Sequence, residues 1–257
     1  MNKKWKNVFI TAMMLLFIAG LFLLLYPYLY GGITENRILG TAEEFLSRVD
    51  LPVFVRPVQP GSTNPSGSDK PTEALEDIRI YPELWADMVA YNESLFTTSQ
   101  AGLSSENAYE APSFILADYG LDSEAIGVLS VPALNFEMPI YLGATDQHLE
   151  DGVAHLSQTS LPIGGENTNA VIAGHRGWYG ADFLRYIEKL KIGDEVVVTN
   201  LWEKLTYTVC EIKVIEPYQV EAVFIQPQRE LLTLLTCHPY ATGGRQRYLV
   251  ICERTKE

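Results

Sequence analysis

Basic residues are scarce in this sequence relative to acidic ones. Its 257 residues include 19 Lys and Arg against 32 Asp and Glu, which gives a formal net charge of −13. A protein that binds nucleic acid needs a basic surface to neutralise phosphates. The charge balance therefore excludes nucleic acid as the expected partner, and we interpret the acidity as a contribution to solubility.

Cysteine is also rare. There are three, at positions 210, 237 and 252, so at most one disulfide can form and one thiol must stay free. No two are spaced as C-x-x-C, which excludes the usual structural zinc site. The four histidines lie too far apart for a H-E-x-x-H site. We therefore expect neither a metal nor a cofactor.

Charge is absent from one long apolar run, Val8 to Tyr30. About 20 residues suffice for a helix to cross the hydrocarbon core of a bilayer. Three lysines precede the run, and three tyrosines lie at its far end, where aromatic side chains favour the membrane interface. The pattern predicts a single-pass anchor in the cell membrane, with a cytoplasmic N-terminus and the remainder extracellular.

A cleaved signal peptide is the alternative interpretation of this run. Signal peptides usually have a shorter apolar region followed by small residues of A-x-A type. Here the run is long and ends in YPYLYGGI. The sequence favours an uncleaved anchor.

Two predicted helices and a linker precede the main domain. Arg37 to Val49 has the pattern of a short amphipathic helix, and Arg56 to Thr72 has the Pro, Gly and Ser content of a linker. From Pro82 to Phe96, apolar residues recur at helical spacing, and proline is tolerated in a first helical turn. Thr97 to Pro112 is expected to be a loop.

Short β-prone runs separated by turn residues dominate the rest, with one predicted helix at Ala181 to Leu190. Many short strands favour a closed or nearly closed barrel, so the fold class is mostly β with few helices. The expected strands are 126–131, 138–142, 170–173, 195–199, 205–215, 231–236 and 248–252. The expected divisions are a cytoplasmic tail (1–7), a membrane anchor (8–30), a juxtamembrane segment and linker (31–81), a helical region and lid candidate (82–124), and a barrel domain (125–257).

Three residues are candidates for chemistry. Cys237 follows a strand-like run and precedes His-Pro-Tyr; a strand-end cysteine is more often inert core, and a nucleophilic one needs a nearby base or cation. His175 lies after an apolar strand in AVIAGHRG, although a turn histidine often only bonds to backbone. Arg247 begins the last strand, where its fork of donors is able to bind an oxyanion, and Arg245 competes for that role.

The order and context of these residues resemble the sortase family. TLLTC (233–237) is similar to the sortase signature TLxTC, AGHRG (173–177) to the histidine motif, and QRYLV (246–250) to the arginine strand. The stretch 155–177 is similar to class C sortases, as are SLPIGG, the helix at 181–196, HPY after the cysteine and the upstream AYNESL helix. The resemblance covers about Ala125 to Arg254.

The resemblance implies an eight-stranded β-barrel and a cysteine transpeptidase on the outside of a Gram-positive cell. It implies Cys237 as nucleophile, His175 as general acid and base, and Arg247 as oxyanion stabiliser, without metal. The substrates it implies are pilins or surface proteins with an LPxTG-type signal, cut between Thr and Gly and passed to an amine. In class C that amine is a pilin lysine; attachment to a peptidoglycan cross-bridge is the alternative.

Two features depart from class C. Its members usually carry an Asp-Pro-aromatic lid over the cysteine and often a second apolar segment near the C-terminus, and neither pattern occurs here. Ala111 to Asp122 is the remaining lid candidate. Cys210 and Cys252 are expected to pack in the core, His238 to line the groove, and Trp178 and Tyr179 to shape the cleft.

Two further functions stay open on the sequence. A tethered barrel that binds sorting signals without catalysis is one, although it would not need Cys, His and Arg together. An L,D-transpeptidase is the other, but its S-x-G-C motif is absent.

Overall fold

The computed structural model describes residues 3–49, 79–104, 108–178 and 181–255. The linker predicted at Arg56 to Thr72 lies outside these residues. The helices are α1 (Lys3–Val49), α2 (Pro82–Thr97) and α3 (Asp146–Asp151), with 3₁₀ turns η1 (Ala101–Ser104), η2 (Leu116–Tyr119), η3 (Pro132–Leu134), η4 (Ile187–Lys189) and η5 (Val220–Val223). The strands are β1 (Ala125–Val131), β2 (Phe136–Leu142), β3 (Val153–His155), β4 (Thr168–Ala173), β5 (Glu195–Asn200), β6 (Lys204–Ile215), β7 (Glu230–His238) and β8 (Gln246–Arg254).

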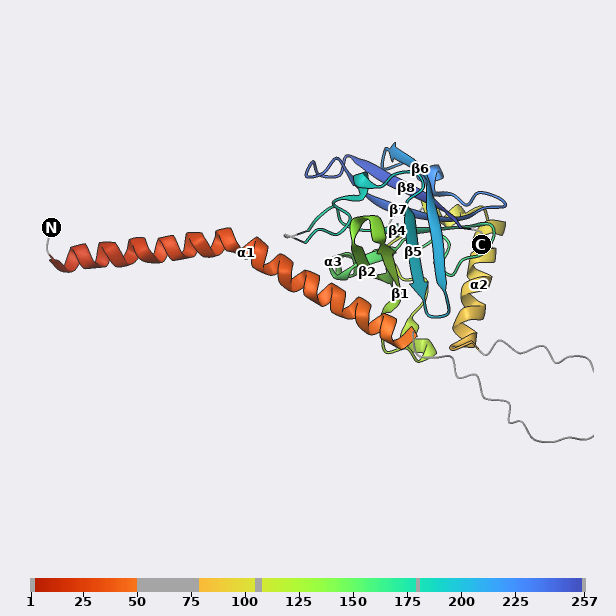
Figure 1. Ribbon diagram of the computed structural model, residues 1–257, viewed down its shortest axis with the longest axis horizontal. Helices are drawn as coiled ribbons and strands as arrows, with labels where there is room; N and C mark the ends of the chain where they lie inside the picture. The colour runs from red at the N-terminus through yellow and green to blue at the C-terminus, as the bar shows by residue number, and fades with distance from the viewer. Residues whose placement is uncertain (1–2, 50–78, 105–107, 179–180, 256–257) are drawn as a thin grey trace, which may run out of the picture.

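These eight strands close into a barrel in the order β1-β2-β3-β4-β7-β8-β6-β5, which confirms the predicted fold (Figure 1). Most neighbours are antiparallel, but β2 with β3 and β4 with β7 are parallel. Residue Thr168 pairs with Glu230 and the register runs unbroken to Ala173 and Leu235. Parallel strands end at the same edge of a sheet, so whatever follows β4 and β7 is brought together.

The hydrophobic core fills the barrel and continues outside it. Ile172, Leu232 and Leu234 belong to the interior cluster, whereas their neighbours Val171 and Leu231 pack into a second cluster with Val223 of η5. Because both faces of β4 and β7 are covered, these strands read as nearly continuous apolar runs rather than as alternating ones. The ends of these strands are therefore held rigidly.

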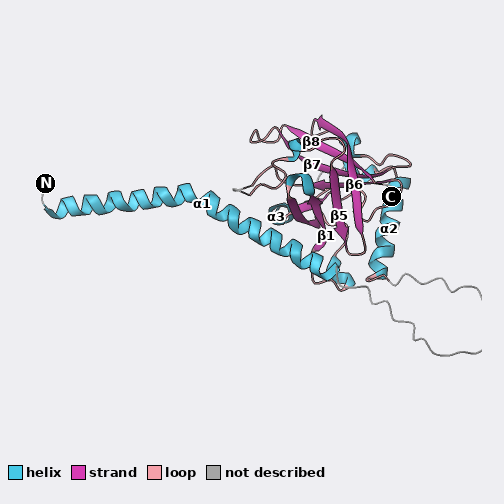
Figure 2. Cartoon of the chain, viewed as in Figure 1, coloured by secondary structure: helices cyan, strands magenta, loops and turns pink. Residues whose placement is uncertain are grey.

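Helix α2 lies against the barrel, as its apolar spacing predicts (Figure 2). Its buried residues are Leu84, Met88, Asn92 and Leu95. Asn92 is a buried polar residue that both donates to and accepts from a loop backbone. Its side chain accepts from the Leu161 N–H at 2.7 Å and donates to the Leu161 carbonyl at 3.3 Å.

The apolar run at the N-terminus and the predicted amphipathic helix form one continuous helix, α1, rather than two. Its first part projects away from the barrel, with exposed apolar side chains, and it is long and apolar enough to cross a membrane (Figure 1). Figure 1 shows a bend along α1, and Pro27, which cannot complete the helical ladder, lies inside it. Its last part buries Ile38, Ala42 and Phe45.

The predicted helix at Ala181 to Leu190 is wrong. Trp178 and Ala181 form an isolated β-bridge, and only η4 is helical in this segment. Phe183 has a φ of 43°, which breaks a right-handed helix, and the Leu184 N–H donates to the His175 carbonyl at 2.9 Å. The apolar residues of this segment are buried as a helix would bury them, but they reach the core from successive turns. Their spacing alone therefore does not distinguish the two structures. The three-residue strand β3 and helix α3 were also missed.

Candidate active site

Cys237 and His175 lie at the same edge of the barrel. Each comes two residues after a member of the last β4–β7 pair, Ala173 and Leu235. The Gly174 N–H donates to the Leu235 carbonyl at 3.1 Å, and the Thr236 hydroxyl donates to the Gly174 carbonyl at 2.7 Å. These two bonds extend the parallel pairing beyond β4 and hold the histidine-bearing turn against the cysteine-bearing strand.

Arg247 is brought to the same edge by β8. It is the antiparallel partner of Cys237 in the β7–β8 pairing. Its Nη1 donates to the carbonyl oxygens of Gly244 at 2.6 Å and Gln246 at 3.1 Å. A Cβ atom placed on Gly244 would lie 3.0 Å from the Cys237 Sγ and 3.5 Å from the Arg247 Nη1. Thiol and guanidinium therefore border the same small space, which Gly244 keeps open.

Aromatic rings hold the imidazole of His175. It stacks on Trp178, with ring centroids 4.3 Å apart and planes 10° apart, and meets Phe183 edge-on at 6.0 Å. Burial lowers the pKa of His175, and the carboxylates of Glu150 and Asp146 oppose that shift. The ring therefore favours its neutral form, the form that is able to act as a base.

The thiol of Cys237 is exposed. The lid candidate Ala111 to Asp122 makes its described contacts elsewhere: the Ser157 hydroxyl donates to the Ala111 carbonyl, and Phe114 packs edge-on to Tyr91 of α2 at 5.7 Å. Within the described part of the chain, this segment lies against α2 and the loop after β3, not over the thiol.

A buried cation lies behind the nucleophile. The side chain of Arg176, which follows His175, is 4% exposed. Its Nη1 donates to the Cys237 carbonyl at 3.3 Å and lies 2.7 Å from the Nδ1 of His238. Its Nη2 pairs with the carboxylate of Glu188 on η4. Neither Arg176 nor Glu188 is recognisable from sequence alone, because side-chain burial is not visible in a GHRG motif.

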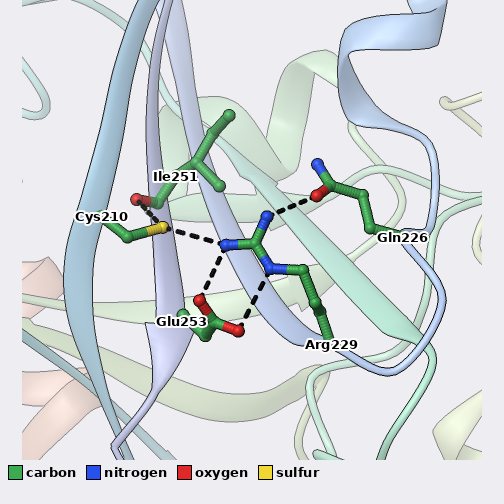
Figure 3. Close-up of polar contacts among 5 residues, drawn as sticks. All are labelled: Cys210, Gln226, Arg229, Ile251 and Glu253. Carbon is green, nitrogen blue, oxygen red and sulfur yellow. Dashed lines mark hydrogen bonds and ion pairs between the residues drawn. The ribbon is translucent and has the colours of Figure 1, made fainter.

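The other two cysteines are structural. Cys252 is buried and Cys210 half-buried; neither forms a disulfide, as predicted. The Cys210 Sγ donates to the Ile251 carbonyl at 3.4 Å and lies 3.5 Å from Arg229, which pairs with Glu253 at 2.8 Å (Figure 3). Burial raises the pKa of both thiols, so both favour the unreactive protonated form.

The structure thus brings together all three predicted site residues. His238 lies beside them and faces Arg176, and Trp178 stacks on His175. A role of Trp178 in shaping the cleft stays a prediction, and Tyr179 lies outside the described residues. Among the residues that the structure describes, no group of three or more His, Cys, Asp and Glu side chains is placed to hold a metal ion.

Known proteins match this chain in sequence. A Sortase domain family model matches residues 129–255. The chain is 29% identical over 133 residues to sortase D of Bacillus subtilis and 30% identical over 135 residues to sortase A of Streptococcus agalactiae. Each alignment covers 51% of this chain, and they cover 64% and 53% of the two relatives. The chain therefore spans less than two thirds of the length of either.

Solved structures match over a larger share. Sortase C1 of Streptococcus agalactiae has a TM-score of 0.62 at 32% identity, covering 69% of this chain and 90% of that one. Sortase C-1 of Actinomyces oris has a TM-score of 0.58 at 31% identity, covering 68% of this chain and all of that one. Both solved chains are more than 30% identical to this one and are matched over nearly their whole length, so the similarity is one of sequence as well as of fold. The chain belongs to the sortase family.

Proposed function

We propose that this protein is a membrane-anchored cysteine transpeptidase that cuts an LPxTG-type sorting signal between Thr and Gly and transfers it to a pilin lysine. One observation carries the proposal. The exposed thiol of Cys237 shares one barrel edge with the imidazole of His175 and the guanidinium of Arg247. Nucleophile, proton carrier and oxyanion donor are the three groups that acyl transfer requires.

The reaction has two halves. In the first, the Cys237 thiolate attacks the threonine carbonyl, Arg247 binds the oxyanion, and the C–N bond breaks as protonated His175 gives its proton to the leaving glycine amine. In the second, neutral His175 takes a proton from the incoming lysine amine as it attacks the thioester, and Cys237 leaves as thiolate. The lowered pKa of His175 favours the neutral ring, which is the form that this second half requires.

The pilin acceptor is supported by the structural neighbours. One of them is described as sortase C1 of a pilus island, at 33% identity and covering 89% of that chain. The anchor at 8–30, the cytoplasmic lysines before it and an extracellular barrel complete the proposal. Attachment of surface proteins to a peptidoglycan cross-bridge is the second candidate, favoured by the uncovered thiol and the lack of an Asp-Pro lid.

The test uses the full chain in detergent micelles, a fluorescence-quenched LPxTG peptide and a lysine-bearing pilin. We expect peptide cleavage, a thioester on Cys237 by mass spectrometry and a covalent pilin ladder, all lost in Cys237→Ala. The matched control is Cys210→Ala, which removes a structural thiol and should keep activity. Cleavage without a ladder would favour cell-wall attachment. Absence of any thioester would overturn the catalytic proposal and favour a barrel that only binds sorting signals.

A further inference from the structure

Arg176 carries a positive charge although its side chain is almost completely buried. Removing a guanidinium from water is unfavourable unless its donors are paired. Its pairing acid, Glu188, is itself 47% exposed, and Nε of Arg176 has no hydrogen-bond partner. Stability alone gives a weak account of such an arrangement, because an apolar side chain of similar volume often stabilises a protein equally well.

Two contacts of Arg176 lead directly to the nucleophile and its neighbour. Its Nη1 reaches the main-chain carbonyl of the nucleophile, Cys237, and the ring of the next residue, His238. Its Nη2 reaches Glu188, and its guanidinium lies 5.7 Å from the ring of Tyr248. Arg176 itself directly follows the proton carrier, His175. One planar fork therefore connects the residue after the histidine to both the cysteine and the residue after the cysteine.

The contact to His238 orients that ring. Its Nδ1 lies 2.7 Å from the Arg176 Nη1 and 3.3 Å from the Oε1 of Glu188, so both members of the ion pair contact this edge of the ring. His238 also packs against Tyr248 at a centroid distance of 5.5 Å. The ring is thus fixed on two sides and holds the end of β7, just beyond the nucleophile.

Resting on the proposed function, we infer that Arg176, clamped by Glu188, is a positioning residue that holds Cys237 and His175 in reactive register through the Cys237 carbonyl and His238. A displacement of about 1 Å between reacting groups lowers rates by roughly a hundredfold. Loss of the guanidinium is therefore expected to lower the rate of the chemical step far more than the affinity for substrate.

The test compares Arg176→Met, Arg176→Lys and Glu188→Gln with wild type, as full chains in micelles. We expect Arg176→Met to lower kcat about a hundredfold while KM changes less than about threefold. Arg176→Lys keeps the charge but offers no planar fork, so it should recover part of the loss. Glu188→Gln keeps a hydrogen-bond acceptor without the charge and should cause a smaller decrease than Arg176→Met.

Arg229→Met is the matched control. Arg229 also pairs with a carboxylate, Glu253, but it precedes β7, about 26 Å along the strand from Cys237 (Figure 3). Its loss should lower the melting temperature without changing kcat. Equal kcat losses in the two Met variants, or a kcat of folded Arg176→Met within about twofold of wild type, would overturn the inference.

A readout independent of turnover separates this inference from the proposed function. Iodoacetamide alkylates exposed cysteines such as Cys237, and the alkylation rate depends on the exposure of the thiol and on the charged groups near it. We expect Arg176→Met to slow alkylation about fivefold and Arg229→Met to leave it unchanged. If wild type cleaves no sorting peptide, the proposed function fails, and alkylation still decides the positioning role: equal rates in wild type and Arg176→Met would refute it.

Discussion

The hydroxyl of Thr236 donates a 2.7 Å hydrogen bond to the main-chain carbonyl of Gly174. Both residues directly precede a candidate catalytic residue, Cys237 and His175. The Thr of the TLLTC segment therefore bonds across the strand pair to the backbone that carries the imidazole.

Thr236→Val removes this bond while conserving shape. The buried Gly174 carbonyl is left unpaired, so we expect the free energy of unfolding to fall by about 1–3 kcal/mol and kcat by about tenfold. Thr233→Val is the matched control, since Thr233 is also fully buried on β7 and donates to the Asn169 side chain at 2.9 Å. It should lose stability but keep kcat; equal kcat values in both variants would show that the Thr236 bond has no catalytic role.

Adjacent glycines provide a second matched pair. Gly244 and Gly243 have φ values of 69° and 77°, so alanine strains the backbone at both. Only at Gly244 does the new methyl group meet Cys237, at 3.0 Å from Sγ; at Gly243 nothing lies within 4 Å. We expect Gly244→Ala to lower kcat/KM about a hundredfold and Gly243→Ala less than about threefold. Steady-state peptide cleavage measures both, and equal losses would attribute the effect to strain alone.

Acid should destabilise the barrel through His155. This residue is fully buried, and burial lowers its pKa to about 4 although the Thr159 and Ser160 carbonyls oppose the shift. As pH falls below about 6.5 the unfolded chain binds a proton that the folded chain refuses, so stability present above that pH is lost progressively down to pH 4. The loss amounts to about 3 kcal/mol, and the half-buried His175 adds a change of the same sign.

Denaturant unfolding from pH 7 to pH 4 measures this dependence. We expect His155→Gln to reduce the slope of unfolding free energy against pH below about 6.5, because glutamine does not titrate. A variant with the wild-type slope would assign acid sensitivity to other groups.

The last part of α1 contacts the loop that supports His175. The Asp182 N–H donates to the Glu35 carboxylate at 3.3 Å, and the next residue, Phe183, packs against the imidazole. We expect Glu35→Ala to lower kcat about threefold, while Glu35→Gln, which keeps the acceptor, stays near wild type. Peptide cleavage by full chains checks both, and an unaffected Glu35→Ala would separate α1 from the site.

The sequence points to three candidate site residues because each stands in a short motif at a strand end. Apolar runs and turn residues also predicted the barrel, since burial on both faces leaves a strong pattern in strands such as β7. The same reasoning mistook Ala181 to Leu190 for a helix, because apolar spacing does not reveal a left-handed Phe183. It overlooked Arg176 because pairing with Glu188, which lies beyond the next turn of the chain, decides whether this arginine is buried or solvated.

The packing of α1 on the barrel limits how far the cleft can lie from the membrane. If α1 crosses the bilayer as proposed, the same helix continues to Ile38, Ala42 and Phe45, which pack on the barrel, so it would act as a rigid spacer rather than a flexible tether. From Tyr30 to Ile38 it rises about 12 Å. In the proposed topology, the cleft is held at a set height and orientation above the lipid headgroups. Sorting signals on chains anchored in the same membrane would then meet it by diffusion in two dimensions.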